Sequence, residues 1–335
     1  IKRVGKKGQF YYPNGPVGLG VDSAGSVYVS DHFADQIRKF GVNGEIIADW
    51  SGFSKPTGIV VDNNDVVYVA DSGHHLVKKF SSDGSLLVTW GGIGTGDGEF
   101  STPWGIAVGS NGTVFVADTG NHRIQAFSPD GVYMDQWGEY GSDPGQFNEP
   151  RGVAVTPEGK VYVADSANYR IQVFTDNGQF VRMWGELGSE MGRFGGGEVL
   201  APIEFTEGPA GISVDDEGIV YVADTHMQRI QKFTAEGQPL TMWCSGGNEL
   251  GYFRNPQDMA IDTDGAIYVS DSYNFRVQKF DFNGRYLGMW NCSSSRIAAG
   301  PSNTVYLAGG QHIFKYTGDG VLVGEWGSEG SGPSQ

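Results

Sequence analysis

The chain has 335 residues, long for one ordinary domain but within the range of a single large β-fold. Its formal charge of −16, from 39 acidic and 23 basic residues, argues against nucleic-acid binding, which draws affinity from Lys and Arg contacts to phosphates. The 53 glycines indicate many tight turns. No apolar run approaches the roughly 20 residues of a membrane helix, so we expect no membrane insertion.

A repeated hairpin runs along the chain. In one copy, Val161–Asp165 alternates β-branched and aromatic residues, a polar turn follows, and alternation resumes over Arg170–Phe174. The aspartate that ends the first hairpin strand recurs at spacings of 40, 47, 47, 59 and 47 residues, and a degraded copy with Gly309 follows after 38 more. The repeated positions are Asp31, Asp71, Asp118, Asp165, Asp224 and Asp271. Self-similarity at this period indicates a repeat architecture.

A second marker has the same period. Seven of the eight tryptophans lie about nineteen residues after the hairpin aspartate or its equivalent: Trp50, Trp90, Trp137, Trp184, Trp243, Trp290 and Trp326. We expect these rings to fill the space between neighbouring units. Chance placement does not explain the regularity.

Each unit contains four predicted strands. The innermost follows a Pro-x-Gly, as over 150–155, and the hairpin and a strand ending in Trp184 complete the unit. Four-stranded units of roughly 40–45 residues are typical of a β-propeller. The sequence therefore predicts an all-β propeller of antiparallel blades in one domain spanning residues 1–335. The expected blades are 10–50, 51–90, 91–137, 138–184, 185–243, 244–290 and 291–326.

The repeat resembles the NHL family. Asp118-Thr119-Gly120-Asn121-His122-Arg123-Ile124-Gln125, preceded by Gly98-Glu99-Phe100 and Pro103-Trp104-Gly105, carries the likeness. The resemblance implies a β-propeller, usually of six blades. Because seven units are present here, we predict seven blades, with six as the alternative.

The two ends both look like parts of a linker between blades. Ile1–Gly5, followed by Gly8-Gln9-Phe10, is similar to the end of a fourth strand and its linker, and Trp326-Gly327 begins the same pattern. We therefore expect either an N-terminal strand that clasps the last blade or a domain excised from a longer polypeptide.

The repeated aspartates and arginines are interpreted as a structural framework. An Asp side chain beside a hairpin turn accepts backbone N–H groups, and the matching arginines are expected to pair or stack between blades. The Asp- and Gly-rich turns at 215–218 and 262–265 lack the ligand set of a calcium loop, so they are interpreted as hairpin turns.

Zinc binding is disfavoured at the histidines. Peptide-amidating lyases that resemble this family hold zinc with histidines near the start of the inner strands. The corresponding positions carry no histidine here: Val17, Thr57, Trp104, Arg151, Ala210 and Gln257. The six histidines lie instead in or beside the turns between the second and third strands, spread around one rim, where convergence on one metal ion is not expected. We expect no cofactor, no bound metal and no catalytic residues.

Cys244 and Cys292 follow equivalent tryptophans in neighbouring units. A disulfide between them is possible, but two unpaired thiols are favoured because equivalent atoms of neighbouring blades diverge outward. The triplets Asn111-Gly112-Thr113 and Asn291-Cys292-Ser293 match the glycosylation pattern and favour an extracellular or periplasmic location.

Candidate binding residues are sought where the copies differ. The predicted channel-mouth set is Thr57, Trp104, Arg151, Gln257 and Asp258, with Asn255 beside it. The linker from Gly195 to Gly208 lengthens the repeat by twelve residues relative to the 47-residue spacing, and Glu198 and Phe205 in it are loop candidates. Trp and Arg are enriched at interface hot spots.

These features predict a non-catalytic scaffold that recognises a protein or glycan partner over one rim, with self-assembly as a further possibility. The competing hypotheses are a metal-dependent lyase or lactonase-like hydrolase with a channel-mouth site, and an RNA-binding NHL domain. The charge of −16 disfavours RNA.

Overall fold

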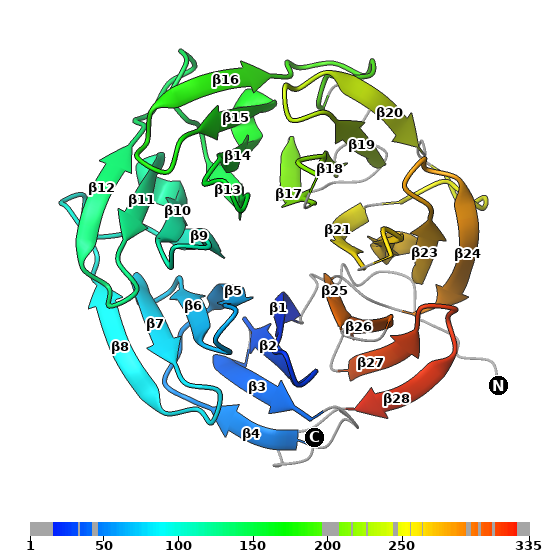
Figure 1. The fold of residues 1–335 in the computed structure, drawn as a ribbon, viewed down its shortest axis with the longest axis horizontal. Coiled ribbons are helices and arrows are strands. Elements are labelled where there is room, and N and C mark those ends of the chain that lie inside the picture. Colours follow the sequence, from blue (N-terminus) through cyan, green and yellow to red (C-terminus); the bar gives the residue numbers. More distant parts are fainter. Residues whose placement is uncertain are drawn as a thin grey trace, which may run out of the picture.

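The computed structural model describes residues 16–32, 34–41, 46–195, 208–215, 217–225, 227–243, 247–254, 256–262, 264–292, 296–300, 303–309 and 312–326. These residues form seven four-stranded antiparallel sheets arranged radially around a central axis (Figure 1). The predicted seven-bladed β-propeller is confirmed, and the six-bladed alternative is wrong. No helix in these ranges is long and apolar enough to cross a membrane.

Each blade takes four consecutive strands, ordered from the central axis outward (Figure 1). Blades 1 to 4 comprise β1 (Pro16–Val21), β2 (Val27–Asp31), β3 (Gln36–Phe40), β4 (Ile46–Trp50); β5 (Pro56–Val61), β6 (Val67–Asp71), β7 (Leu76–Phe80), β8 (Leu86–Gly91); β9 (Pro103–Val108), β10 (Val114–Asp118), β11 (Arg123–Phe127), β12 (Tyr133–Trp137); and β13 (Pro150–Val155), β14 (Val161–Asp165), β15 (Arg170–Phe174), β16 (Phe180–Trp184). Blades 5 to 7 comprise β17 (Pro209–Val214), β18 (Val220–Asp224), β19 (Arg229–Phe233), β20 (Pro239–Trp243); β21 (Pro256–Ile261), β22 (Ile267–Asp271), β23 (Arg276–Phe280), β24 (Tyr286–Asn291); and β25 (Arg296–Gly300), β26 (Thr304–Gly309), β27 (His312–Thr317), β28 (Leu322–Trp326). Short 3₁₀ turns follow β10, β14 and β22: η1 (Thr119–Asn121), η2 (Ser166–Asn168) and η3 (Ser272–Asn274).

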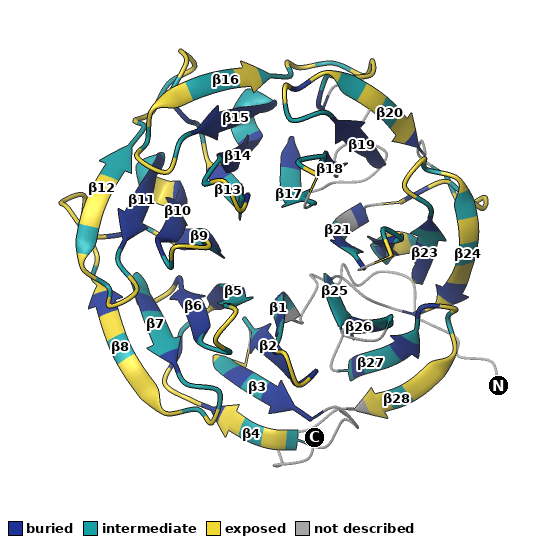
Figure 2. Ribbon diagram, in the orientation of Figure 1, coloured by how far each residue is buried: buried dark blue, intermediate teal, exposed yellow. Residues whose placement is uncertain are grey.

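The predicted hairpin is present in register. In blade 4, β14 and β15 pair from Val161 opposite Phe174 to Asp165 opposite Arg170. All ten residues of these two strands are buried, because a neighbouring blade covers each face of the sheet. The outermost strands carry most of the exposed strand residues (Figure 2). The second and third strands therefore hold the core, while the fourth faces solvent.

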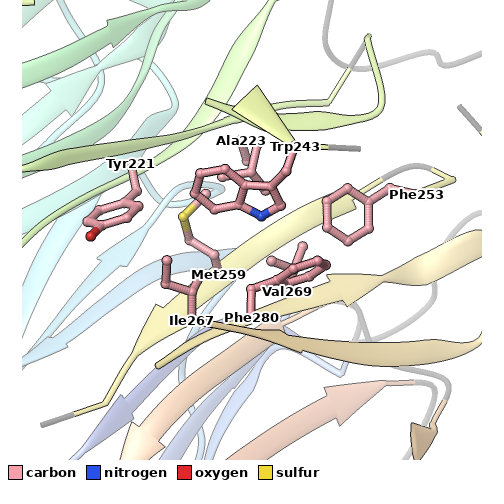
Figure 3. Packing of buried hydrophobic residues seen from close by; sticks show 9 residues of the cluster. Tyr221, Ala223, Trp243, Phe253, Met259, Ile267, Val269 and Phe280 are labelled. Carbon is pink, nitrogen blue, oxygen red and sulfur yellow. The ribbon is translucent and has the colours of Figure 1, made fainter. Parts of the chain in front are cut away.

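The hydrophobic core is divided into clusters between adjacent blades. The cluster between blades 5 and 6 gathers Trp243, Met259, Ile267 and Phe280 (Figure 3). The Trp243 and Phe280 rings lie 6.2 Å apart at 47°. Fully burying a side chain of this size contributes roughly 1.5–3 kcal/mol, and the pattern repeats at the other junctions. Stability is thus spread around the ring.

The repeated tryptophans fill the space between blades, as predicted. In blades 1 to 6 each ring covers a turn glycine of the next blade: a Cβ added to Gly178 would lie 2.7 Å from the Trp137 ring, and one added to Gly237 would lie 2.4 Å from Trp184. Gly178 also has φ of 75°, in the left-handed region that favours glycine. Tryptophan in one unit and glycine in the next therefore form one packing element.

The two rims of the ring differ in what they carry. Every inner strand begins, and every outer strand ends, on one rim, so this rim holds the linkers between blades and the turns between second and third strands; we call it the linker rim. The opposite rim holds the remaining turns and is called the far rim. The predicted channel-mouth residues follow the prolines that begin the inner strands, so they belong to the linker rim.

The ring closes where blade 7 meets blade 1. Val27, Val29 and Phe40 pack against Tyr306 and other residues of blade 7. The Tyr306 hydroxyl donates to the Gly25 carbonyl at 3.0 Å. The N-terminal segment predicted to clasp the last blade lies outside the described residues.

Candidate functional site

The repeated aspartates are buried structural acceptors. In blade 4, the Asp165 carboxylate accepts the backbone N–H of Asn148 at 2.7 Å, Arg170 Nε at 2.7 Å and Gln172 Nε2 at 3.0 Å. Burial raises the pKa of Asp165, and these hydrogen bonds oppose that rise. The predicted backbone acceptance is present, although the N–H comes from the preceding linker rather than from the hairpin turn.

The matching arginines join neighbouring blades. Arg170 donates to the carbonyl oxygens of Ser142 at 2.6 Å, Asp143 at 3.0 Å and Gln146 at 2.7 Å, all in the linker from blade 3. Blades 3, 5 and 6 repeat the arrangement through Arg123, Arg229 and Arg276. As predicted from the sequence, these charged side chains hold neighbouring blades together. We call the Asp, Arg and Gln side chains of one blade, such as Asp165, Arg170 and Gln172, the linker clamp.

The Asp-rich turns of the far rim are hairpin turns. Asp262 Oδ1 accepts the backbone N–H groups of Asp264 at 3.0 Å and Ala266 at 2.8 Å, and Tyr268 donates to its other oxygen at 2.8 Å. The Asp215 carboxylate makes the equivalent contacts to Glu217 and Ile219. Their carboxylates thus have structural partners.

Three of the histidines also serve the framework. The Nδ1 atoms of His75 and His122 accept the backbone N–H groups of Thr102 and Glu149, each at 3.1 Å, and so link one blade to the next. His74 Nδ1 lies 3.0 Å from the buried Asp71 carboxylate. Among the described residues, no three His, Cys, Asp or Glu side chains are grouped so that they would hold a metal ion. His226 lies outside them.

Trp104 and Arg151 come together at the channel mouth. The Arg151 guanidinium lies 5.7 Å from the centroid of the Trp104 ring, and it donates to Glu149 at 2.9 Å. The His32 ring of blade 1 lies 6.5 Å from the Trp104 ring, and burial lowers the pKa of His32, which keeps the ring neutral near pH 7. Three blades thus contribute to one cluster, Trp104, Arg151, Glu149 and His32, which we call the mouth cluster.

Thr57 is a correction to the predicted channel-mouth set. Its side chain is fully buried, and its hydroxyl contacts Ser72 Oγ at 2.7 Å and the Pro103 carbonyl at 3.1 Å. A small hydroxyl at this position satisfies polar groups between blades 2 and 3. It is therefore unavailable to a partner.

Asp258 is also placed differently from the predicted polar arc. Its carboxylate accepts the backbone N–H of Ile297 in blade 7 at 3.1 Å. Burial raises the pKa of Asp258, whereas the positive charge of Arg296 lowers it. Asn255, the side chain of Gln257, and the loop candidates Glu198 and Phe205 lie outside what the structure describes.

Asp258 and Arg296 occupy a position that is glycine in the first five blades. In blades 1 to 4, a Cβ there would lie 2.1–2.5 Å from a carbonyl oxygen of the next inner strand, so only glycine allows the close approach. Arg296 Nε donates to the Val17 carbonyl of blade 1. These side chains bridge blades 6, 7 and 1. Sequence reasoning missed Arg296, although the replacement of glycine at this repeat position could have indicated it.

Cys292 is a free, buried thiol, and burial raises its pKa to about 12. Cys244 lies outside the described residues. The free Cys292 agrees with the favoured expectation of unpaired thiols.

The blades, their tryptophan–glycine packing and the linker clamps define a β-propeller of repeated blade units. The family model for the NHL repeat matches residues 53–80, 100–127, 147–174, 206–233 and 253–280. The chain therefore contains five NHL repeats, consistent with an NHL-repeat β-propeller. No curated protein sequence matches it.

Several solved structures share the fold. A streptogramin B lyase is 17% identical, with a TM-score of 0.71 over 91% of this chain and 94% of that one. A catalytically inactive variant of virginiamycin B lyase from Staphylococcus aureus with quinupristin is 16% identical, with a TM-score of 0.69 over 89% and 92%. Hydrazine synthase from Kuenenia stuttgartiensis is 12% identical, with a TM-score of 0.64 over 98% and 99%. At these identities the likeness establishes architecture only.

Proposed function

We propose that this protein is a non-catalytic recognition module that binds a protein partner over the linker rim, centred on the mouth cluster. The carrying observation is the contact between Trp104 and Arg151 at positions where other blades place small side chains such as Val17 and Ala210. Buried Trp and Arg side chains dominate the energetics of many protein interfaces. The mouth cluster differs from the equivalent residues of the other blades. It lies at the channel mouth, where a bound partner would contact several blades.

Exposed apolar side chains on the same rim support a protein rather than a glycan. Ile93, Tyr140 and Leu187 occupy equivalent positions in three successive linkers, and they are 76%, 69% and 56% exposed. A partner that contacts the mouth cluster and these linkers would bury a wide apolar surface with a charged centre. Aromatic residues and Arg are enriched at protein interfaces, which favours a protein partner.

The test is binding by a double variant, Trp104→Ala with Arg151→Ala. Immobilised wild-type protein is used to isolate a partner from an extract of the source organism, and the purified partner's Kd is measured for both forms. We expect at least a hundredfold weaker binding, since hot-spot truncations cost about 2 kcal/mol or more each. Phe180→Ser, on the exposed outer strand of blade 4, is the control and should bind normally. Unchanged affinity of the double variant would refute the proposal.

The enzymatic alternative is a metal-dependent lyase or a lactonase-like hydrolase. His74, His75 and His122 face backbone groups or a buried aspartate rather than one another, which disfavours a shared metal ion. Metal analysis of the purified protein separates the two hypotheses: stoichiometric zinc or calcium would favour the enzyme. RNA binding is disfavoured by the charge of −16 and is checked by a gel-shift assay at low salt.

A further inference from the structure

The junction between blades 1 and 2 lacks a loop that the next four junctions contain. Nine residues separate the tryptophan of one blade from the linker phenylalanine of the next at 91–99, 138–146, 185–193 and 244–252. Between Trp50 and Phe53 there are only Ser51 and Gly52. The Phe53 ring still packs on Phe80 at 5.6 Å, as Phe100 packs on Phe127 at 5.5 Å. The junction is otherwise built on the same plan.

At the longer junctions this loop covers the outer half of the following blade. The Gly98 N–H donates to Gln125 Oε1 at 2.9 Å. A Cβ on Gly98 would lie 3.8 Å from Tyr133 and 3.9 Å from the Phe127 ring. The same hydrogen bond joins Gly145 to Gln172, Gly192 to Gln231 and Gly251 to Gln278, at 2.8–2.9 Å. These four glycines have φ of 77–86°, in the left-handed region that favours glycine. The surface therefore accepts a stretch of polypeptide with a glycine at this position.

In blade 2 the described residues leave the equivalent surface uncovered. A groove of about 400 Å³ is lined by Trp50, Lys78, Phe80, Leu86 and neighbouring backbone. Lys78, Phe80 and Leu86 stand where Gln125, Phe127 and Tyr133 contact the loop in blade 3. Leu86 is 56% exposed at the edge of the groove. The groove is thus the space that the missing loop fills elsewhere.

Lys78 changes the polarity of the groove. Its ammonium group lies 2.7 Å from the Asp71 carboxylate and donates to the Gly52 carbonyl. These contacts match those of Gln125 Nε2 with the blade 3 aspartate and with the residue before the linker phenylalanine. The ammonium group also lies 4.6 Å from the centroid of the Phe53 ring, and it has donors only at the position where Gln125 presents an acceptor oxygen. An occupant should therefore place a carbonyl oxygen there.

The other charges of the groove are already compensated. The Asp49 carboxylate is held by Arg38 Nε at 2.6 Å, and Leu76 replaces the clamp arginine. No unbalanced charge selects a strongly charged ligand, whereas Phe80 and Leu86 offer apolar contact. An uncharged backbone segment fits these walls.

We propose that this groove, between blades 1 and 2, binds an extended glycine-containing peptide segment of a partner protein. A glycine lies against Phe80, and a backbone carbonyl accepts a hydrogen bond from Lys78. The site is separate from the mouth cluster, so either proposal can fail without the other.

The test uses a fluorescein-labelled peptide with the loop sequence of residues 138–146, and measures its fluorescence anisotropy on titration with the whole protein. We expect a Kd on the order of 10⁻⁴ M, typical of a short weakly ordered segment. The same peptide with valine in place of its last glycine should bind at least tenfold more weakly, because this glycine, Gly145 in the native loop, has φ of 86°, a conformation that a β-branched residue strongly disfavours.

Two variants check the location. Replacing Ser51-Gly52 with residues 138–146, together with Leu76→Arg and Lys78→Gln, rebuilds the loop and its clamp and should weaken binding at least tenfold. Leu86→Lys, at an exposed site that folding tolerates, should weaken it similarly, while Lys160→Gln on the far rim should not. Absence of binding to the wild type, equal binding of the valine peptide, or unchanged affinity in Leu86→Lys would each overturn the proposal.

Discussion

The junction between blades 3 and 4 and the junction between blades 1 and 2 share a plan but differ in one component. At the first, Arg170 and Gln172 hold a nine-residue loop through its carbonyl and N–H groups. At the second, Leu76 and Lys78 replace them, the loop is missing, and a groove is open. Clamp and loop are lost together, because a buried guanidinium without carbonyl partners would be costly. The comparison separates residues that hold the ring from residues free to bind.

Removing the clamp should have the largest effect. We expect Arg170→Ala to lower the free energy of unfolding by about 3–5 kcal/mol, since it leaves the buried Asp165 carboxylate without its charged partner. Urea denaturation measures the change. Arg182→Ala, at an exposed ion pair of 3.8 Å, is the matched control and should cost less than about 1 kcal/mol. Equal losses in the two variants would contradict a special role for the clamp.

The tryptophan–glycine packing should come next. Gly178→Ala places a Cβ against Trp137 at a left-handed φ, and we expect a loss of about 2–4 kcal/mol. Gly145→Ala, at a similar φ of 86° but with no atom within 4 Å of the added Cβ, should lose only about 1–2 kcal/mol. Thermal unfolding followed by circular dichroism compares them, and a reversed order would show that packing is not the dominant cost.

The junction between blades 6 and 7 should respond to pH. The pKa of Asp258 is raised in the folded protein, so the folded state binds its proton more tightly than the unfolded state does. Stability from this group is therefore present below the unfolded pKa and declines as pH rises toward the folded pKa. Asp258→Asn should remove this decline. Urea midpoints of both proteins from pH 3.5 upward provide the measurement; parallel curves would refute the assignment.

The smallest effect concerns Cys292. Because burial raises the pKa of its thiol to about 12, we expect little alkylation by iodoacetamide at pH 8 in the folded protein and complete alkylation in urea. Mass spectrometry of the peptide that contains Cys292 gives the readout. Rapid modification of this cysteine in the native state would show that the junction between blades 6 and 7 opens readily.

The fold was predictable because the same sequence pattern recurs from blade to blade. The Asp165 and Trp184 positions recur in phase, and the alternation over 161–165 and 170–174 defines the hairpin without knowledge of distant contacts. The framework role of Asp165 followed from the same repetition. Its hydrogen bonds bear it out.

The candidate site was less predictable because it depends on which way each side chain turns. Trp104 and Arg151 meet as adjacent positions should, but Thr57 at the same repeat position turns its hydroxyl inward to Ser72. The bridge made by Asp258 and Arg296 depends on contacts between residues far apart in sequence. Only replacement of the repeated glycine marked it.

The closure between blades 7 and 1 has a mechanical consequence. Six junctions are crossed by the polypeptide itself, whereas this one is held in the described structure by contacts such as those of Tyr306 with Gly25 and Arg296 with Val17. We therefore expect blades 7 and 1 to separate before the sheets within the blades are disrupted. Under tension or gentle heating, the first motion should separate blade 7 from blade 1 while the sheet of every blade stays intact. The ring is then more flexible at this junction than elsewhere.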